Sequence, residues 1–404
     1  MPAPKIYDNG LDPFGDKRSK VDGILYATDR EPAEIDDKQS FYANERGRVL
    51  RLGIGDISFD KGGVDWEEAR RVSLLKNRSR DYPLKLTNIN EFGVLESSEG
   101  YISKYAQNGN RPKSGDAEFA NRVNKILARS DKKDIYLYVH GFKVIFDNPL
   151  LVGMELWHFL GYDGAFIAYA WPSTPSKWAY LKDLETTEFS ARNLRLLIEF
   201  LSKNTRARQI HIVGYSAGTR VVIGALAQLA LINKGKNKAQ IHKKLRIGNV
   251  ILVGSDADTN VFSGYLEDGL LNVQKSLTIY MSDTDKALGL SNFLFARRRL
   301  GQAFNVDETS PAVINLLQRI PDLHLIDVSN AENASAGNGH AYFRNSPWVS
   351  SDILMTLKYE LPPGERGIYR KDDSPLWQFP EDYLIQLKED LKELLPGYSE
   401  ALKK

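Results

Sequence analysis

The sequence predicts an α/β fold in which a mostly parallel β-sheet is covered by helices on both faces. Short runs rich in β-branched and aromatic residues recur along the chain, and segments with helical spacing separate them. The runs are nearly continuously apolar, as in Ile-Tyr-Leu-Tyr-Val at 135–139, which is typical of strands buried on both faces. Strands that alternate with helices form parallel sheets, and ligands bind at the carboxyl ends of the strands.

Length and composition restrict the class of protein. The 404 residues are 42% hydrophobic and 26% charged, as expected for a globular chain with a large core. A formal net charge of +2 does not indicate nucleic acid or an anionic membrane as a partner. We find no run of roughly 18 apolar residues, hence no transmembrane segment, and no signal peptide. We therefore expect a soluble protein, cytoplasmic as read or exported if a leader was removed.

Four regions are predicted from the order of these segments. Residues 1–22 are a polar N-terminal arm, and 23–115 are a β-rich cap region with strands at 24–28, 49–59 and 84–95. The core, 116–355, contains the alternating segments, and 356–404 form a C-terminal extension that ends in an amphipathic helix at 381–395. We expect core helices at 116–128, 150–160 and 187–202, strands at 135–139, 165–170, 210–213, 249–254, 276–281 and 323–328, the last being the final strand, and a solvated loop at 233–244.

The core is organised around Gly214-Tyr215-Ser216-Ala217-Gly218, which lies between a predicted strand and a predicted helix. Glycines two positions before and after a serine allow a sharp turn and a close approach of strand and helix. This pattern is a nucleophile elbow, and it predicts Ser216 as a catalytic nucleophile.

A serine nucleophile needs a general base, and in α/β-hydrolases the acid and then the histidine follow the serine along the chain. His242, His324 and His340 follow Ser216. His242 precedes the candidate acids, and His324 begins a predicted strand. His340 lies on a Gly- and Asn-rich loop after the last strand, so we predict it as the base.

Two predicted strands end in acidic residues that could orient the histidine. Asp283 and Asp285 follow one strand, and Asp256 follows the strand before it. The penultimate strand is the usual source of the acid in this fold, which favours Asp285 and leaves Asp283 and Asp256 as alternatives. Because Lys286 starts a helix-like segment, Asp285 can also be read as a helix N-cap.

The remaining candidates surround the nucleophile. The backbone amides of Ala217 and Phe142 are predicted to form the oxyanion hole, with His140 ordering the loop that carries Phe142. No P-loop, dinucleotide fingerprint or His-x-x-x-His metal pair is present, and no cofactor or metal is expected. Candidates for lining a substrate pocket are Phe142, Trp171, Trp178, Tyr180 and Tyr215.

Several motifs in matching order make the chain resemble a bacterial α/β-hydrolase family of unknown function whose members are described as esterase- and lipase-like. The shared motifs lie at 26–30, 41–46, 52–53, 139–142, 171–173, 285–288 and 339–342. The resemblance implies a serine hydrolase with Ser216, Asp285 and His340 as its triad. The chain departs from the family pattern at Tyr215, Ala217 and Lys143, which affects the expected pocket shape.

These observations predict hydrolysis of a carboxylic ester, a small or lipid-like molecule, through an acyl-enzyme on Ser216. Esters are favoured because alkoxide leaving groups need less assistance than amines. The alternatives are an acyltransferase, thioesterase or amidase that uses the same residues, and a non-catalytic binding protein with this fold.

Overall fold

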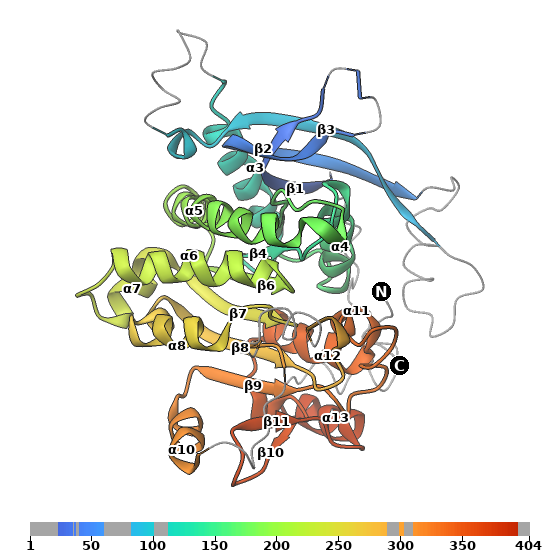
Figure 1. Cartoon of the computed structure of the whole chain (residues 1–404), viewed down its shortest axis with the longest axis vertical. Helices are drawn as coiled ribbons and strands as arrows, with labels where there is room; N and C mark the ends of the chain where they lie inside the picture. Colours follow the sequence, from blue (N-terminus) through green and yellow to red (C-terminus); the bar gives the residue numbers. More distant parts are fainter. Residues whose placement is uncertain are drawn as a thin grey trace.

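A computed structural model describes residues 23–34, 36–37, 40–59, 82–100, 112–288, 299–302 and 310–394. In this part of the chain one sheet of 11 strands runs in the order β10-β11-β9-β8-β7-β6-β4-β5-β1-β2-β3 (Figure 1). The strands are β1 (Ile24–Pro32), β2 (Tyr42–Phe59), β3 (Leu84–Val94), β4 (Asp134–Val139), β5 (Ala165–Tyr169), β6 (Gln209–Tyr215), β7 (Ile247–Val253), β8 (Gln274–Met281), β9 (Leu323–Asp327), β10 (Tyr369–Arg370) and β11 (Leu376–Gln378).

All pairings from β11 through to β1 are parallel, and the pairs β1–β2, β2–β3 and β10–β11 at the two ends are antiparallel. This confirms the predicted mostly parallel α/β architecture. Strand β1 pairs with β5 through Tyr26 and Ala168, so the β-rich N-terminal region extends the central sheet. The predicted arm at 1–22 and the final residue of the predicted 381–395 helix lie outside the described residues.

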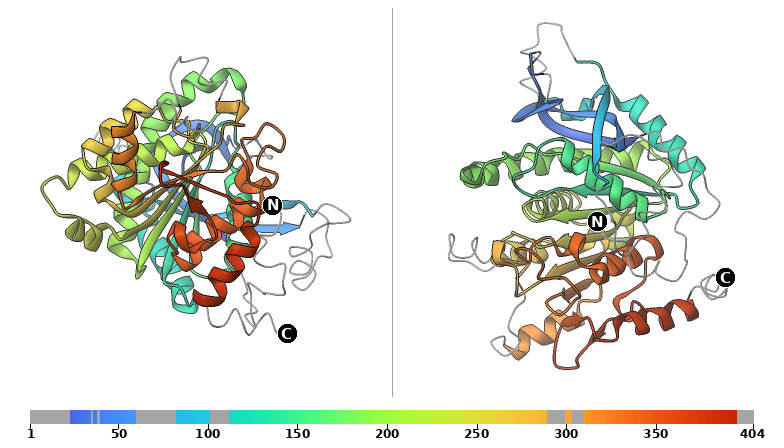
Figure 2. Two further views of the ribbon diagram at one scale, coloured as in Figure 1. Left: turned by 90° about the horizontal axis from the view of Figure 1, so that it is seen from below. Right: turned by 90° about the vertical axis from the view of Figure 1, so that its right-hand side faces the viewer.

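Helices cover both faces of the sheet, as the two views of Figure 2 show. One apolar core lies between the sheet and α3 (Asp116–Arg129), α5 (Tyr180–Asn204), α6 (Gly218–Ile232), α7 (Lys238–Leu245) and α8 (Thr259–Glu267). A second core lies on the other face, under α4 (Asp147–Phe159), α11 (Tyr342–Asn345), α12 (Pro347–Leu354) and α13 (Tyr383–Leu394). Helix α10 (Pro311–Arg319) precedes β9.

Two expectations about the elements are wrong. The segment 233–244 was expected to be a loop but contains most of α7, because Asn237 and Gln240 form a reciprocal capping box that begins a helix. The strand at 323–328 is not the last, since β10 and β11 follow it. These two strands are only 2 and 3 residues long, too short to produce a recognisable alternation in the sequence.

Candidate active site

The turn between β6 and α6 holds Ser216 in an unusual backbone conformation. Its φ is +51°, in the left-handed region, which costs a non-glycine residue about 1–2 kcal/mol. The Ser216 amide donates to the Val253 carbonyl at 2.9 Å, and the Ser216 carbonyl accepts from the Thr219 amide at 3.0 Å and hydroxyl at 2.6 Å. These hydrogen bonds compensate for the strain and fix the serine at the carboxyl end of β6.

The second glycine of the motif is required by close packing. A Cβ atom on Gly218 would lie 2.1 Å from the His140 carbonyl oxygen and 2.6 Å from that of Val139. Glycine therefore lets the first turn of α6 approach the end of β4, as the sequence pattern predicts.

His340 bridges Asp285 and Ser216 through its two ring nitrogens. Nδ1 lies 2.6 Å from Asp285 Oδ2, and Nε2 lies 2.8 Å from Ser216 Oγ. An ionised carboxylate can only accept a hydrogen bond, so Nδ1 carries the proton and Nε2 presents its lone pair to the hydroxyl. An imidazole held in this way can take a proton from the serine as its oxygen attacks a carbonyl carbon.

Asp285 has a second set of contacts. Its Oδ1 accepts from the backbone amides of Ala287 and Leu288, both at 3.1 Å, while Oδ2 contacts His340. The carboxylate therefore caps the following turn and also holds the imidazole. The two interpretations of Asp285 that were open in the sequence are both compatible with the structure.

The loop that carries His340 is fastened to the ends of β7 and β8. The Tyr342 hydroxyl donates to the Tyr280 carbonyl at 2.8 Å and accepts from the Gly254 amide at 2.6 Å. A Cβ atom on Gly254, whose φ is +55°, would lie 3.1 Å from His340 Cε1. The imidazole thus packs directly against the backbone that follows β7.

The alternative acids are engaged differently. Asp256 is buried; its Oδ2 accepts from the Tyr180 hydroxyl and from Arg220 Nε at 3.2 Å. Asp283 is exposed and lies two residues before Asp285 on the same loop. Among the described residues, Asp285 is the candidate acid that contacts His340.

The other two histidines that follow Ser216 lie at the opposite end of the sheet. His324 is the second residue of β9, and burial lowers its pKa to about 4. His242 lies in α7, the helix that immediately precedes β7, and burial lowers the pKa of His242 as well. Neither position is near the carboxyl ends of the strands, where Ser216 lies.

The loop after β4 passes beside the serine. A Cβ atom on Gly141 would lie 2.9 Å from Ser216 Cβ, so the approach requires glycine. Lys143 adopts a left-handed φ of +62° on the same loop. Within the described part of the chain, the amides of Phe142 and Ala217 donate to no other group, so both remain available to an oxyanion.

His140, which is buried, holds this loop in place through its ring and its carbonyl group. Its ring stacks on Trp171 at 5.2 Å with an interplanar angle of 8°, and Trp171 Nε1 donates to the His140 carbonyl at 2.6 Å. Its Nδ1 and Nε2 lie 2.7 and 3.0 Å from the Gly141 and Trp171 carbonyl oxygens. Burial and the charge of Arg30 lower the pKa of His140 to about 3, so the ring is neutral and donates to one of these oxygens at a time.

The aromatic pocket candidates occupy different environments. Trp171 is fully buried beneath the loop, whereas Trp178 is 96% exposed. The Tyr215 ring lies 5.2 Å from the ring of His340 and 4.8 Å from that of Phe343, which also lines an apolar cavity between α4 and α12. Of the proposed pocket residues, Tyr215 is in direct contact with the His340 ring.

The sequence profile of one family, described as "Alpha/beta hydrolase of unknown function (DUF900)", matches residues 115–357, more than half of the chain. The chain belongs to this α/β-hydrolase family. Membership confirms the resemblance inferred from the motifs and indicates a hydrolase of some kind. A search among curated proteins finds no match. Among the described helices, none is both long and apolar enough to cross a membrane.

The hydrolase also contains a cluster of possible metal ligands at the amino end of β4. Oxygen atoms of Asp134 and Glu360 lie within 4.8 Å of a ring nitrogen of His211. However, the backbone amide of Asn249 donates to His211 Nδ1 at 3.0 Å. Nε2 therefore carries the ring proton and offers no lone pair to a metal. Arg208 bonds to both carboxylates, at 2.8 Å to Asp134 Oδ2. The donor set fits an ion-paired cluster and not a metal site.

Sequence reasoning gave no role to Arg30 and Tyr342, which contact the loops of the site. Arg30 Nη2 donates to the Val144 carbonyl on the loop after β4, and Tyr342 fastens the His340 loop. Both residues belong to motifs that carried the family resemblance. Their place in these motifs was the one indication in the sequence that the two residues matter, because neither an arginine nor a tyrosine at its position suggests a chemical role.

Proposed function

We propose that the protein is a serine esterase that cleaves carboxylic esters through an acyl-enzyme on Ser216. The single observation that supports this most is the pair of hydrogen bonds that link Asp285, His340 and Ser216, at a serine with a left-handed backbone. This arrangement supports the proposal that the three residues act as a catalytic triad.

In the proposed reaction, His340 Nε2 takes the hydroxyl proton as Ser216 Oγ bonds to the ester carbonyl carbon. The negative charge that develops on the carbonyl oxygen is stabilised by the amides of Ala217 and Phe142. The tetrahedral intermediate expels the alkoxide, which leaves as the alcohol with the proton from His340. Water then attacks the acyl-enzyme by the same steps and releases the carboxylic acid.

A fluorophosphonate probe and p-nitrophenyl esters of graded acyl length test the proposal. The wild-type protein should be labelled and should hydrolyse the esters, while Ser216→Ala should lose both properties. Ser58→Ala, at an exposed serine of β2, is the matched control and should behave as the wild type. Undiminished labelling and activity in Ser216→Ala would refute the assignment.

The same residues can serve an acyltransferase, a thioesterase or an amidase. Supplying alcohol or thiol acceptors and analysing the products separates transfer from hydrolysis, and thioester and amide substrates separate the bond types. A wild-type protein that is not labelled by the probe would favour a non-catalytic binding protein.

A further inference from the structure

The tripeptide Thr28-Asp29-Arg30, in the second half of β1, lies outside the residues that match the family profile, yet it contacts the core beside the candidate active site. The Thr28 hydroxyl donates to the Ala170 carbonyl at 2.7 Å, and Asp29 Oδ2 accepts from the Tyr169 hydroxyl at 2.9 Å. All three residues are fully buried. The tripeptide therefore docks against the end of β5, next to the loop after β4.

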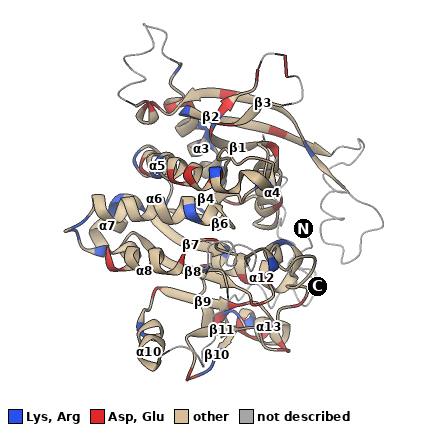
Figure 3. Ribbon diagram, in the orientation of Figure 1, with Lys and Arg blue, Asp and Glu red and all other residues tan. Residues whose placement is uncertain are grey.

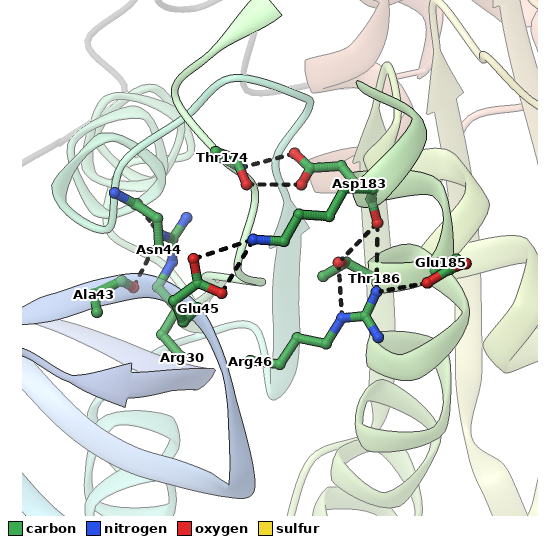
Figure 4. A network of polar contacts seen from close by, with 10 residues as sticks. Arg30, Ala43, Asn44, Glu45, Arg46, Thr174, Asp183, Glu185 and Thr186 are labelled. Atoms are coloured by element: carbon green, nitrogen blue, oxygen red, sulfur yellow. Dashed lines mark hydrogen bonds and ion pairs between the residues drawn. The ribbon is translucent and has the colours of Figure 1, made fainter. Parts of the chain in front are cut away.

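Arg30 joins two segments that are far apart in the sequence. Its Nη2 donates to the Val144 carbonyl at 2.7 Å, and its Nη1 donates to Asn44 Oδ1 at 2.5 Å and to the Ala43 carbonyl at 3.3 Å. Figure 4 shows the guanidinium beside Ala43 and Asn44 of β2. The side chain thus connects the N-terminal hairpin with the loop that contains Phe142.

Val144 is held from a second side by Ser173. The Ser173 hydroxyl donates to the Val144 carbonyl at 2.8 Å and accepts from the Val144 amide at 3.0 Å. Lys143, in its left-handed conformation, lies between this fixed residue and Phe142. Fixing the peptide groups of Val144 therefore restricts the direction in which the Phe142 amide can point.

The guanidinium remains charged when the protein is folded. Burial lowers the pKa of Arg30 to about 10, opposed by the charges of Asp29, Asp183 and Asp147, so the side chain is protonated at neutral pH. A charged donor forms a stronger hydrogen bond than a neutral one. Because Arg30 is buried, water cannot easily replace the guanidinium as the donor to the Val144 carbonyl.

We propose that Arg30 is a positioning residue that holds the loop after β4 so that the Phe142 amide faces the oxyanion formed at Ser216. The inference rests on the proposed function. It connects one residue of the N-terminal hairpin, Arg30, to the proposed oxyanion hole, although the hairpin lies outside the matched family region.

The chain supplies a matched control in a second arginine of the same hairpin. Arg46 Nε donates to the Thr186 hydroxyl at 2.9 Å, and Arg46 Nη2 lies 3.6 Å from Glu185 Oε2, both on α5 (Figure 4). Arg46 therefore attaches the hairpin to a helix and has no contact with Val144 in the described structure. Its removal should weaken docking without displacing the oxyanion loop.

The first measurement compares Arg30→Met with Arg46→Met in ester hydrolysis. Arg30→Met should lower kcat by about 10- to 100-fold with KM changed by less than about 3-fold, since an oxyanion donor acts mainly in the transition state. Binding of a trifluoromethyl ketone, which forms a tetrahedral adduct with the serine, should weaken by about the same factor as kcat/KM. Arg46→Met should keep kcat within about 2-fold of the wild type.

Hydrogen exchange gives a readout that does not depend on catalysis. Amides at 141–146 should exchange faster in Arg30→Met than in the wild type and in Arg46→Met. If Arg30→Met does not fold, Arg30→Lys replaces it, because a single ammonium cannot reach both Val144 and Asn44.

Wild-type kcat and wild-type exchange at 141–146 in a folded Arg30 variant would overturn the inference. If the wild-type protein itself does not cleave esters, the proposed function fails. In that case unchanged exchange in the Arg30 variant would still show that Arg30 does not hold the loop.

Discussion

At the scale of single residues, the two buried aspartates near the site differ in their partners. Asp285 accepts from His340 and from two backbone amides, whereas Asp256 accepts from Tyr180 and Arg220. The types of partner predict different roles. An aspartate that accepts a hydrogen bond from an imidazole sets the tautomer of the ring. An aspartate that pairs with an arginine has its negative charge balanced by the guanidinium.

Asp285→Asn should therefore lower kcat for ester hydrolysis by about 10³- to 10⁴-fold, because an amide does not enforce the Nδ1–H tautomer of His340. Asp256→Asn should lower kcat by less than about 10-fold, since it changes only the surroundings of the site. Steady-state kinetics of the two purified variants checks the ranking. A larger loss in Asp256→Asn would contradict the assignment of the acid.

At the scale of elements, the strand β6, the turn and the helix α6 depend on a close approach to β4. Gly218 is the residue at which this approach is closest, with two carbonyl oxygens within 2.6 Å of a hypothetical Cβ atom. Gly264, in the middle of α8, has no atom within 4 Å of its hypothetical Cβ. Substitutions at these two helical glycines therefore distinguish the effect of close packing, at Gly218, from the effect of helix propensity alone, at Gly264.

Gly218→Ala should lower the free energy of unfolding by about 1–3 kcal/mol or prevent folding, because α6 must move away from β4. Gly264→Ala should instead raise it by about 0.4–1 kcal/mol, since alanine reduces the entropy of the unfolded chain. Urea denaturation followed by circular dichroism measures both. Equal effects of the two substitutions would show that the packing at Gly218 is not restrictive.

At the scale of the whole molecule, both regions that flank the matched core are joined to it by buried polar groups. On the C-terminal side, Arg366 pairs with Asp352 of α12 at 3.2 Å, with both side chains fully buried. Glu360 pairs with Arg208, which also pairs with the buried Asp134 at the amino end of β4. Basic and acidic residues are otherwise interspersed over the helices and strands (Figure 3), consistent with the small net charge.

The cluster at β4 predicts a pH dependence of stability. Burial opposes ionisation of Asp134 and Glu360, but hydrogen bonds to their partners outweigh it and hold both pKa values below the ordinary range. A carboxylate with a lowered pKa contributes stability above its unfolded pKa, about 4, and the contribution is lost as the pH falls through the folded pKa.

Because the Arg208 side chain is 52% exposed, solvent screens its ion pairs. Arg208→Met should therefore lower the free energy of unfolding at pH 7 by about 0.5–1 kcal/mol, and the difference from the wild type should shrink below about pH 4. Urea denaturation at pH 7 and pH 3 measures it. Lys392→Met, which removes an exposed pair with Glu389, should change stability by less than about 0.5 kcal/mol at either pH. A difference for Arg208→Met that stays constant or grows in acid would contradict the role assigned to the cluster.

Much of the fold was predictable because its elements are strongly patterned. Continuous apolar runs located the central strands, and the glycines around Ser216 predicted the turn between β6 and α6. Helix α7 was missed because its start depends on the Asn237–Gln240 capping box within a segment dominated by lysines. The short strands β10 and β11 form by tertiary pairing, β11 with β9 and β10 with β11, so no local pattern indicates them.

The sequence by itself determined the class of fold and the candidates Ser216, Asp285 and His340, because a strained turn requires glycines and chain order restricts the partners of the serine. It favoured Asp285 but kept Asp283 and Asp256 as alternatives, and it gave no indication that Arg30 reaches Val144. Those contacts join residues 55 to 124 positions apart, and only the tertiary structure decides which side chains meet at such separations.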